Sequence, residues 1–359
     1  MKLLRPGSGT GNLAKIRALQ RAGGQCQVNL RQPEMPDLTA FISGSTGFVG
    51  TATVRAFAKA GMHVRAGTRA SHKDVRTIPY AHEVTSHGDI EHEASWSQIL
   101  NGCDVVVHIA GPAHLNLGPA EIAPAQRVII EGTKNLAAGA ARAGVKRFVY
   151  LSSAHVFGSQ SSPRHPFREA DQTRPQSPYA IAKQQAEREV IRTAAGSDMD
   201  YVIVRPPMVY GPGAPGNFSR LLRLVASSRP LPLGGAQALR SFIGIDNLAS
   251  ALLVAAEHPA ASNDLFNISD GDDCSTAQMI HLIAQAQDRR TWLFRAPQFL
   301  LLIGAHLMGK RPDFDKIFQP FQIDISHFRN ATGWRPPLSL REGICDAIKS
   351  APNLKPHRA

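Results

Sequence analysis

Short apolar runs alternate with segments of helical period along most of this chain. Residues 38–43 form an apolar run of strand length, and residues 51–61 have apolar positions at helical spacing before they end at a glycine. Further segments of both kinds follow: the predicted strands are residues 63–69, 105–111, 147–153 and 264–268, and a helix entered after a proline covers residues 177–187. This alternation predicts an α/β protein with a doubly wound parallel sheet.

A glycine-rich turn joins the first predicted strand to the first predicted helix. Glycines let the backbone come close to a pyrophosphate, and the N–H groups that begin a helix face its negative charge. The position of this turn therefore predicts a dinucleotide cofactor, held by seven consecutive residues: Gly44, Ser45, Thr46, Gly47, Phe48, Val49 and Gly50.

The order of these patterns divides the chain into a sheet domain and a smaller lobe. We expect a Rossmann-type domain from residues 37–205 and 241–269. Residues 206–240 and 270–348 are expected to form a C-terminal substrate lobe, with residues 349–359 as a tail. Ligands should then lie at the carboxyl ends of the strands, between domain and lobe.

The ends of the next strands offer further contacts to the cofactor. Arg69 stands where an NAD site places a carboxylate, which favours NADP; the alternative is an ordinary surface arginine. Asp89, followed by Ile90, is placed to accept a hydrogen bond from the adenine amino group; a helix N-cap is the other interpretation. Ala110 and Gly111 are small enough for the cofactor to pass close to the backbone.

Three side chains predict proton and hydride chemistry. Ser153 ends a predicted strand, and Tyr179 and Lys183 are four residues apart, so they share one face of the predicted helix. A free phenol titrates near ~10, and a neighbouring ammonium together with an oxidised nicotinamide would lower that pKa. Tyr179 is then the candidate general acid/base, Lys183 its activator and ribose anchor, and Ser153 the donor to the substrate oxygen.

This combination resembles the extended short-chain dehydrogenase/reductases of the NAD-dependent epimerase/dehydratase family. The resemblance covers about residues 38–348, and it includes the stretches 130–136, 152–158, 209–213, 240–243, 246–247 and 332–336. Within the family, the chain is similar to bacterial UDP-glucose 4-epimerase-like proteins and to UDP-N-acetylquinovosamine 4-keto reductases. The resemblance implies NAD or NADP as cofactor, a UDP-linked nucleotide sugar as substrate, and a homodimer paired through two helices.

Departures from the family pattern narrow the chemistry. Family dehydratases carry Asp and Glu where this chain has Ala154 and His155, and alanine cannot transfer a proton. Two asparagines of many relatives, one near the catalytic helix and one near the substrate phosphates, correspond to Ile129 and Met208. Epimerisation and 4-keto reduction need only hydride transfer and one acid/base, so both stay open, as does a non-catalytic dinucleotide sensor. The resemblance favours epimerisation at C4, whereas Arg69 favours an NADPH-dependent reductase of a 4-keto sugar or another small carbonyl compound.

Three residues are candidates for the substrate. Arg240 resembles the family's phosphate-binding arginine, whose planar group suits bidentate contact. Asn217 is placed to replace the lost amide, and its other interpretation is a turn residue. Arg311 is a further candidate, against a surface charge at a helix end.

Residues 1–36 do not fit the α/β pattern. They contain six Lys/Arg and one acidic residue, so they supply +5 of the formal net charge of +12. We expect this segment to be disordered or loosely helical, with a true start near Met35 and a basic arm for an anionic surface as alternatives. No apolar stretch follows its basic start, so a secretory signal is not expected.

Composition indicates a soluble enzyme. Hydrophobic residues make up 43% of the chain, but no run is long enough to span a membrane. The most apolar stretch, 292–308, is expected to be a buried helix of the smaller lobe, with a membrane contact as the alternative. The four cysteines are scattered without metal-ligand spacing, which favours the cytoplasm and no metal site. No DNA- or RNA-binding motif accompanies the basic charge.

Overall fold

The computed structural model describes most of the chain from Leu38 to Ser350. The expectations for residues 1–36 and for most of the tail lie outside the described residues. The described ranges are 38–70, 77–92, 95–112, 119–162, 165–309 and 311–350.

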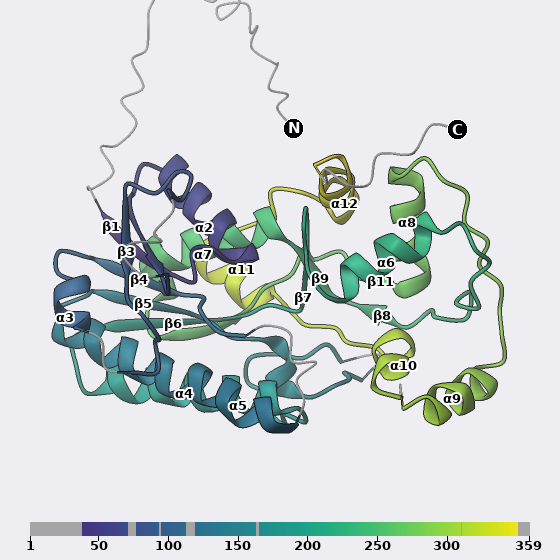
Figure 1. Cartoon of the computed structure of the whole chain (residues 1–359), viewed down its shortest axis with the longest axis horizontal. Coiled ribbons are helices and arrows are strands. Elements are labelled where there is room, and N and C mark those ends of the chain that lie inside the picture. Colours follow the sequence, from purple (N-terminus) through teal and green to yellow (C-terminus); the bar gives the residue numbers. More distant parts are fainter. Residues whose placement is uncertain are drawn as a thin grey trace, which may run out of the picture. The chain divides into compact units, whose positions relative to one another are not determined.

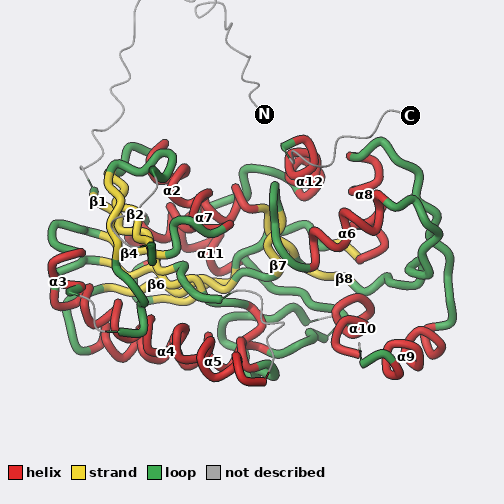
Figure 2. Tube along the Cα trace, viewed as in Figure 1, coloured by secondary structure: helices red, strands yellow, loops and turns green. Residues whose placement is uncertain are grey.

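A seven-stranded parallel sheet forms the centre of the fold (Figures 1 and 2). Its strand order is β10-β6-β5-β4-β1-β2-β3, and every neighbouring pair is parallel. The strands are β1 (Thr39–Ser43), β2 (His63–Thr68), β3 (Glu83–Ser86), β4 (Val105–His108), β5 (Arg147–Leu151), β6 (Asp200–Arg205) and β10 (Asp264–Asn267). The order reverses between β1 and β4, and the expected doubly wound α/β sheet is confirmed.

The strands are apolar on both faces because helices cover both. Ala40 and Ile42 of β1 belong to the apolar cluster on one face, whereas Phe41 between them belongs to the cluster on the other. Helices α2 (Phe48–Lys59) and α7 (Ile245–Glu257) pack together on the first face. Helices α3 (Trp96–Ile99), α4 (Pro119–Arg142) and α5 (Pro178–Ala195) belong to the second face.

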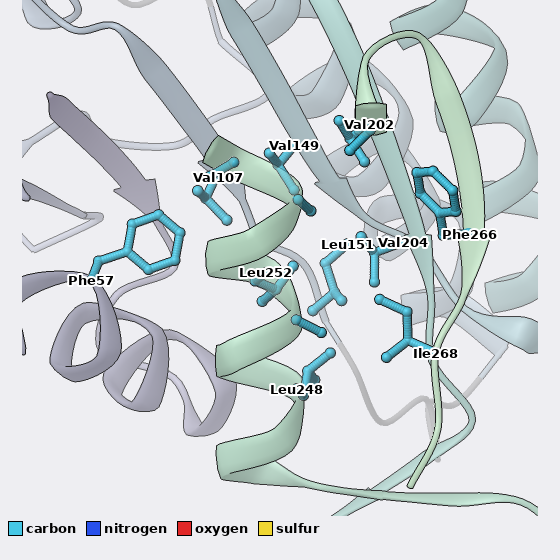
Figure 3. Packing of buried hydrophobic residues seen from close by; sticks show 14 of the residues in the cluster. Phe57, Val107, Val149, Leu151, Val202, Val204, Leu248, Leu252, Phe266 and Ile268 are labelled. Atoms are coloured by element: carbon cyan, nitrogen blue, oxygen red, sulfur yellow. The ribbon is translucent and has the colours of Figure 1, made fainter. Parts of the chain in front are cut away.

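Helix α7 supplies much of the packing on the first face. Leu248 and Leu252 are fully buried, and Figure 3 shows them among side chains from neighbouring strands. These strand residues are Val107, Val149, Leu151, Val202, Val204 and Phe266. The chain therefore returns to the sheet after residue 240, through α7 and then β10.

A third apolar cluster lies outside the sheet. Around it are the short pairs β7 (Met208–Tyr210) with β9 (Phe242–Gly244), and β8 (Leu239–Arg240) with β11 (Cys274–Ser275). Six further α-helices lie among the described residues between 217 and 349: α6 (Asn217–Ala226), α8 (Thr276–Ala286), α9 (Gln298–Leu307), α10 (Arg311–Phe318), α11 (Ser326–Thr332) and α12 (Leu340–Lys349). α6, α8 and α12 pack on this cluster.

One structural expectation is wrong. The apolar stretch 292–308 is not a buried helix: only Gln298–Leu307 is helical, and several of its apolar side chains are exposed. The error arises because apolar composition alone does not say whether a helix has neighbours on all sides.

Within the described residues, no helix is both long and apolar enough to cross a bilayer. In the same ranges, no group of three or more His, Cys, Asp and Glu residues is arranged to hold a metal ion.

Candidate active site

The glycine turn is too tightly packed for larger residues. A Cβ atom on Gly50 would lie 2.0 Å from the carbonyl oxygen of Gly44, and one on Gly44 would lie 2.9 Å from Cα of Ala110. Gly44 also has φ of +70°, a left-handed conformation that glycine adopts without strain. Gly47 precedes α2 and provides no side-chain cap, which leaves the first N–H groups of the helix available to an anion. These features fit a bound dinucleotide pyrophosphate.

The residues expected to contact the adenosine part of the cofactor follow the carboxyl ends of two neighbouring strands, β2 and β3. Arg69 directly follows β2 and is exposed, and Asp89 is exposed in the loop after β3. No helix begins directly after Asp89, so the N-cap interpretation is wrong; the Asp89 carbonyl instead accepts from the N–H of His92 in a turn. Ile90 is buried against Gly132, so only its backbone is free to face a cofactor.

A buried hydrogen-bond network, which the sequence did not reveal, supports the end of β4. His108 Nδ1 lies 2.7 Å from Ser43 Oγ, and its Nε2 lies 2.9 Å from Thr133 Oγ1. Ser43 Oγ also accepts from the N–H groups of Ile109 at 3.1 Å and Ala110 at 3.3 Å. Burial holds the pKa of His108 well below 6.5, and the ring stays neutral. The network holds the backbone of Ile109 and Ala110 beside the glycine turn.

The three candidate catalytic residues come from β5 and α5. Ser153 is buried just after β5, and its hydroxyl accepts from the N–H of His155 at 3.3 Å, at the start of the short helix η1 (Ala154–Phe157). Tyr179 lies in the first turn of α5, which contacts η1, and Lys183 lies one turn later. The Lys183 Nζ donates to the carbonyl of Leu151 at 2.8 Å and lies 5.9 Å from the centroid of the Tyr179 ring.

Burial controls the protonation of this pair in the protein alone. Desolvation raises the pKa of Tyr179 to about 12. It lowers the pKa of Lys183 to about 8, although the nearby carboxylate of Glu187 raises it. Desolvation is the cause of the Tyr179 shift, so the expected lowering of the phenol pKa would require the charge of a bound oxidised nicotinamide.

A buried ion pair anchors α5 to the sheet. Glu187 follows Lys183 by four residues on the same helix face, and its two oxygens accept from Arg205 Nε at 2.9 Å and Nη2 at 2.6 Å. Glu187 also accepts from the hydroxyl of Ser152 at 2.5 Å, one residue before Ser153. Glu187 was not among the residues predicted from the sequence, although its i+4 spacing from Lys183 was a usable signal.

Arg240 of β8 and His155 of η1 lie near each other, because both contact the ring of Phe321. Arg240 is buried, donates to the carbonyl of Gln319 at 2.6 Å and lies over the ring of Phe321 at 5.4 Å. The His155 ring packs on the same Phe321 at 4.6 Å between centroids. Burial lowers the pKa of Arg240 to about 10 and that of His155 to about 4, the latter also because of the Arg240 charge.

Acidification is expected to destabilise the protein partly through His155. Its folded-state pKa of about 4 lies below the ordinary 6.5, so the unfolded state takes up a proton first as the pH falls. Stability from this group is complete above pH 6.5 and is lost as the pH falls towards about 4. A His155→Gln variant should show a shallower decline of its thermal midpoint from about pH 7 to about pH 4.5. Equal slopes in variant and parent would contradict this assignment.

The other two substrate candidates are both exposed at helix starts. Asn217 is the first residue of α6, so the interpretation as a turn residue is wrong. Arg311 is the first residue of α10, and its Nε lies 3.9 Å from Asp315 in an exposed i, i+4 pair. No described contact joins either residue to Tyr179 or Ser153, and both remain predictions.

Comparisons with known proteins identify the family of the chain. The profile of the "NAD dependent epimerase/dehydratase family" matches residues 40–269. "UDP-glucose 4-epimerase" of Vibrio cholerae is 38% identical over 84% of this chain and 92% of its own length. "N-acetyl-alpha-D-glucosaminyl-diphospho-ditrans,octacis-undecaprenol 4-epimerase" of Escherichia coli O157:H7 is 25% identical over 84% and 91%.

The fold has close counterparts among solved structures. The structure "MoeE5 in complex with UDP-glucose and NAD" superposes with a TM-score of 0.69 at 23% identity, over 87% of this chain and 98% of its own. At this identity the likeness concerns the fold. With the family profile and the Vibrio cholerae relative, it leads to one assignment: the chain belongs to the NAD-dependent epimerase/dehydratase family, and it is an enzyme of the extended short-chain dehydrogenase/reductase type.

Proposed function

We propose that this enzyme interconverts a UDP-sugar and its C4 epimer. The observation that carries the proposal is the placement of Tyr179 and Lys183 on one face of α5, with the Lys183 ammonium held at the carboxyl end of β5. The 38% identity to a UDP-glucose 4-epimerase supports the choice of reaction and of the UDP-linked substrate.

The chain supplies the proton chemistry and the positioning. Ser153 donates a hydrogen bond to the C4 oxygen, and Tyr179 accepts the hydroxyl proton and later returns it. Lys183 positions the ribose and favours the phenolate by its charge. NAD(P) held by the glycine turn and Lys183 would supply an acceptor and a donor for the C4 hydride, so that epimerisation involves no net oxidation.

The neighbours of Ser153 argue against dehydration. Ala154 is fully buried and has no proton to transfer. His155 has a pKa of about 4, so near neutral pH it is an uncharged imidazole and a weak acid towards a leaving hydroxyl. Elimination of water would therefore lack the acid that protonates the leaving hydroxyl.

The substrate side is proposed from the remaining predictions. Arg240, Asn217 and Arg311 are the candidate contacts to the diphosphate, and residues 206–240 with 270–348 are the candidate substrate lobe. The Escherichia coli relative acts, by its name, on a sugar carried by diphospho-undecaprenol, so a lipid-linked diphosphate sugar is a second candidate substrate. We also propose a cytoplasmic homodimer; free thiols at Cys103, Cys274 and Cys345 support the compartment.

A reductase is the second candidate function, favoured by one observation. Arg69 is exposed at the end of β2, where it could meet the 2′-phosphate of NADP. An enzyme that consumes NADPH would reduce a 4-keto sugar or another small carbonyl compound with the same Ser153, Tyr179 and Lys183. A non-catalytic dinucleotide sensor would leave these three residues without a purpose.

The bound cofactor and the redox balance separate these functions. We expect the purified enzyme to release NAD on denaturation, and to convert UDP-glucose into UDP-galactose without added cofactor or net change in absorbance of the reduced nicotinamide. An empty protein that oxidises added NADPH in the presence of a 4-keto nucleotide sugar would overturn the epimerase proposal. Competition between NAD and NADP for the emptied site decides the preference attributed to Arg69.

A further inference from the structure

Helix α9 and the segment before it expose an unusual amount of apolar surface. Leu307 is 81% exposed, Trp292 70% and Phe299 63%. We call this the α9 surface; it consists of Trp292, Phe294, Phe299, Leu300, Ile303 and Leu307. Most single exposed apolar residues need no explanation, but six within 16 residues of sequence form a patch of the kind that marks an interaction site.

The exposed residues occupy one face of α9. Phe299, Ile303 and Leu307 are spaced by four residues, so they lie along one side of the helix. Ala305 is buried and Leu301 and Leu302 are half-buried on the other side, and α9 packs against α10. The helix is therefore apolar on two sides, and only one of them has a partner among the described residues.

The two aromatic residues before α9 are held outwards by the backbone. The carbonyl of Trp292 accepts from the N–H of Leu231 at 2.9 Å, and the N–H of Phe294 donates to the carbonyl of Leu231 at 3.0 Å. Between them, Leu293 turns inwards and packs on the third apolar cluster. Successive side chains of this extended segment point to opposite sides, so Trp292 and Phe294 face the solvent while Leu293 faces the cluster.

The stretch of chain that carries this surface is basic. From Arg289 to Arg311 the sequence contains five Lys/Arg and no Asp or Glu, and acidic residues occur only beyond its ends. Arg290 and Arg295 are exposed, and Arg311, which is also exposed, lies 3.9 Å from Asp315. Symmetric pairing of two copies through this surface would bring like charges together, which opposes association. Aromatic and aliphatic residues flanked by Lys/Arg are instead typical of helices that lie in the interface of an anionic membrane.

We propose that the α9 surface docks the enzyme on anionic phospholipid bilayers, with α9 lying in the plane of the interface. Trp292 and the exposed face of α9 enter the headgroup region, and the surrounding arginines meet lipid phosphates. In Figure 1, α9 and α10 lie at the end of the molecule remote from β1–β3. The chain after α10 contacts the candidate site, where Gln319 and Phe321 touch Arg240. Docking therefore brings the substrate side of the site towards the membrane.

Vesicle sedimentation of the full chain tests this proposal. We expect the protein to sediment with vesicles of phosphatidylcholine and phosphatidylglycerol, and to bind them less in high salt or when the vesicles are pure phosphatidylcholine. A double variant, Phe299→Asn with Leu307→Asn, should weaken binding to the anionic vesicles by about tenfold or more, since it removes two membrane-buried side chains. The matched control is Tyr80→Ser, which replaces an exposed apolar residue more than 200 residues before α9 in the sequence. This variant should bind the anionic vesicles like the parent.

The controls keep the outcomes distinguishable. Both variants should retain the parent's thermal midpoint, because the side chains that they replace are exposed. The proposal is overturned if anionic vesicles bind no protein, or if the double variant binds as well as the parent, which would assign binding to the basic segment 1–36. It is also overturned if the parent forms a dimer that the double variant cannot form and neither binds vesicles, which would make the surface a self-association site.

Discussion

A Tyr179→Phe variant is expected to lose roughly 10²–10⁴-fold in kcat for C4 epimerisation while it still retains NAD. The substitution removes the phenol hydroxyl and keeps the ring, which Lys183 Nζ approaches to 5.9 Å from the centroid. Because Ser153 can donate a hydrogen bond but is a poor proton acceptor, the C4 hydroxyl would lose its base. The cofactor contacts of the glycine turn do not involve Tyr179, so binding should persist.

Kinetics and cofactor content must be measured on the same preparation. Tyr201→Phe is the matched control, because Tyr201 lies near the amino end of β6, away from the carboxyl ends of the strands. We expect the control to keep the parent's kcat. If Tyr179→Phe also kept it, another group would have to move the proton, and the assignment of Tyr179 would fail.

Replacement of Glu187 by glutamine is expected to destabilise the protein by about 3–5 kcal/mol. Both side chains of the Glu187–Arg205 pair are almost fully buried, so the variant leaves the arginine charge without a compensating carboxylate. The same change replaces the charged acceptor of the Ser152 hydroxyl, next to Ser153, by a neutral amide, which weakens that hydrogen bond. It should also lower the pKa of Lys183 further, because the Glu187 charge raises it.

Denaturant unfolding of Glu187→Gln beside Glu189→Gln isolates this effect. Glu189 is on the same helix and pairs with Arg192, which is exposed, and such surface pairs contribute about 0–1 kcal/mol. A loss for Glu187→Gln no larger than that of the control would show that the buried pair does not anchor α5.

Local patterns in the sequence predicted the elements that local chemistry determines. The strand, glycine turn and helix around Gly44 are contiguous, and the i, i+4 spacing of Tyr179 and Lys183 follows from helix geometry. Contacts between distant residues carried no such signal. Ser43 and His108, which form a hydrogen bond, are 65 residues apart in the sequence. The hydrogen-bonded residues Glu187 and Arg205 belong to different elements, a helix and a strand.

The exposure of α9 could not be predicted for a related reason. Its composition is that of a buried helix, and only the positions of its neighbours show that one face has none among the described residues. The pKa of Tyr179 is a similar case, since its burial depends on how α5 packs against the end of β5.

The fate of the hydrogen at C4 tests the central claim most directly. UDP-glucose that carries deuterium at C4 is incubated with the enzyme in ordinary water, and the product is examined by NMR and mass spectrometry. Transfer of a hydride away from C4 and back predicts UDP-galactose that keeps its deuterium at C4. A product in which hydrogen from water has replaced the deuterium would contradict hydride transfer at this carbon.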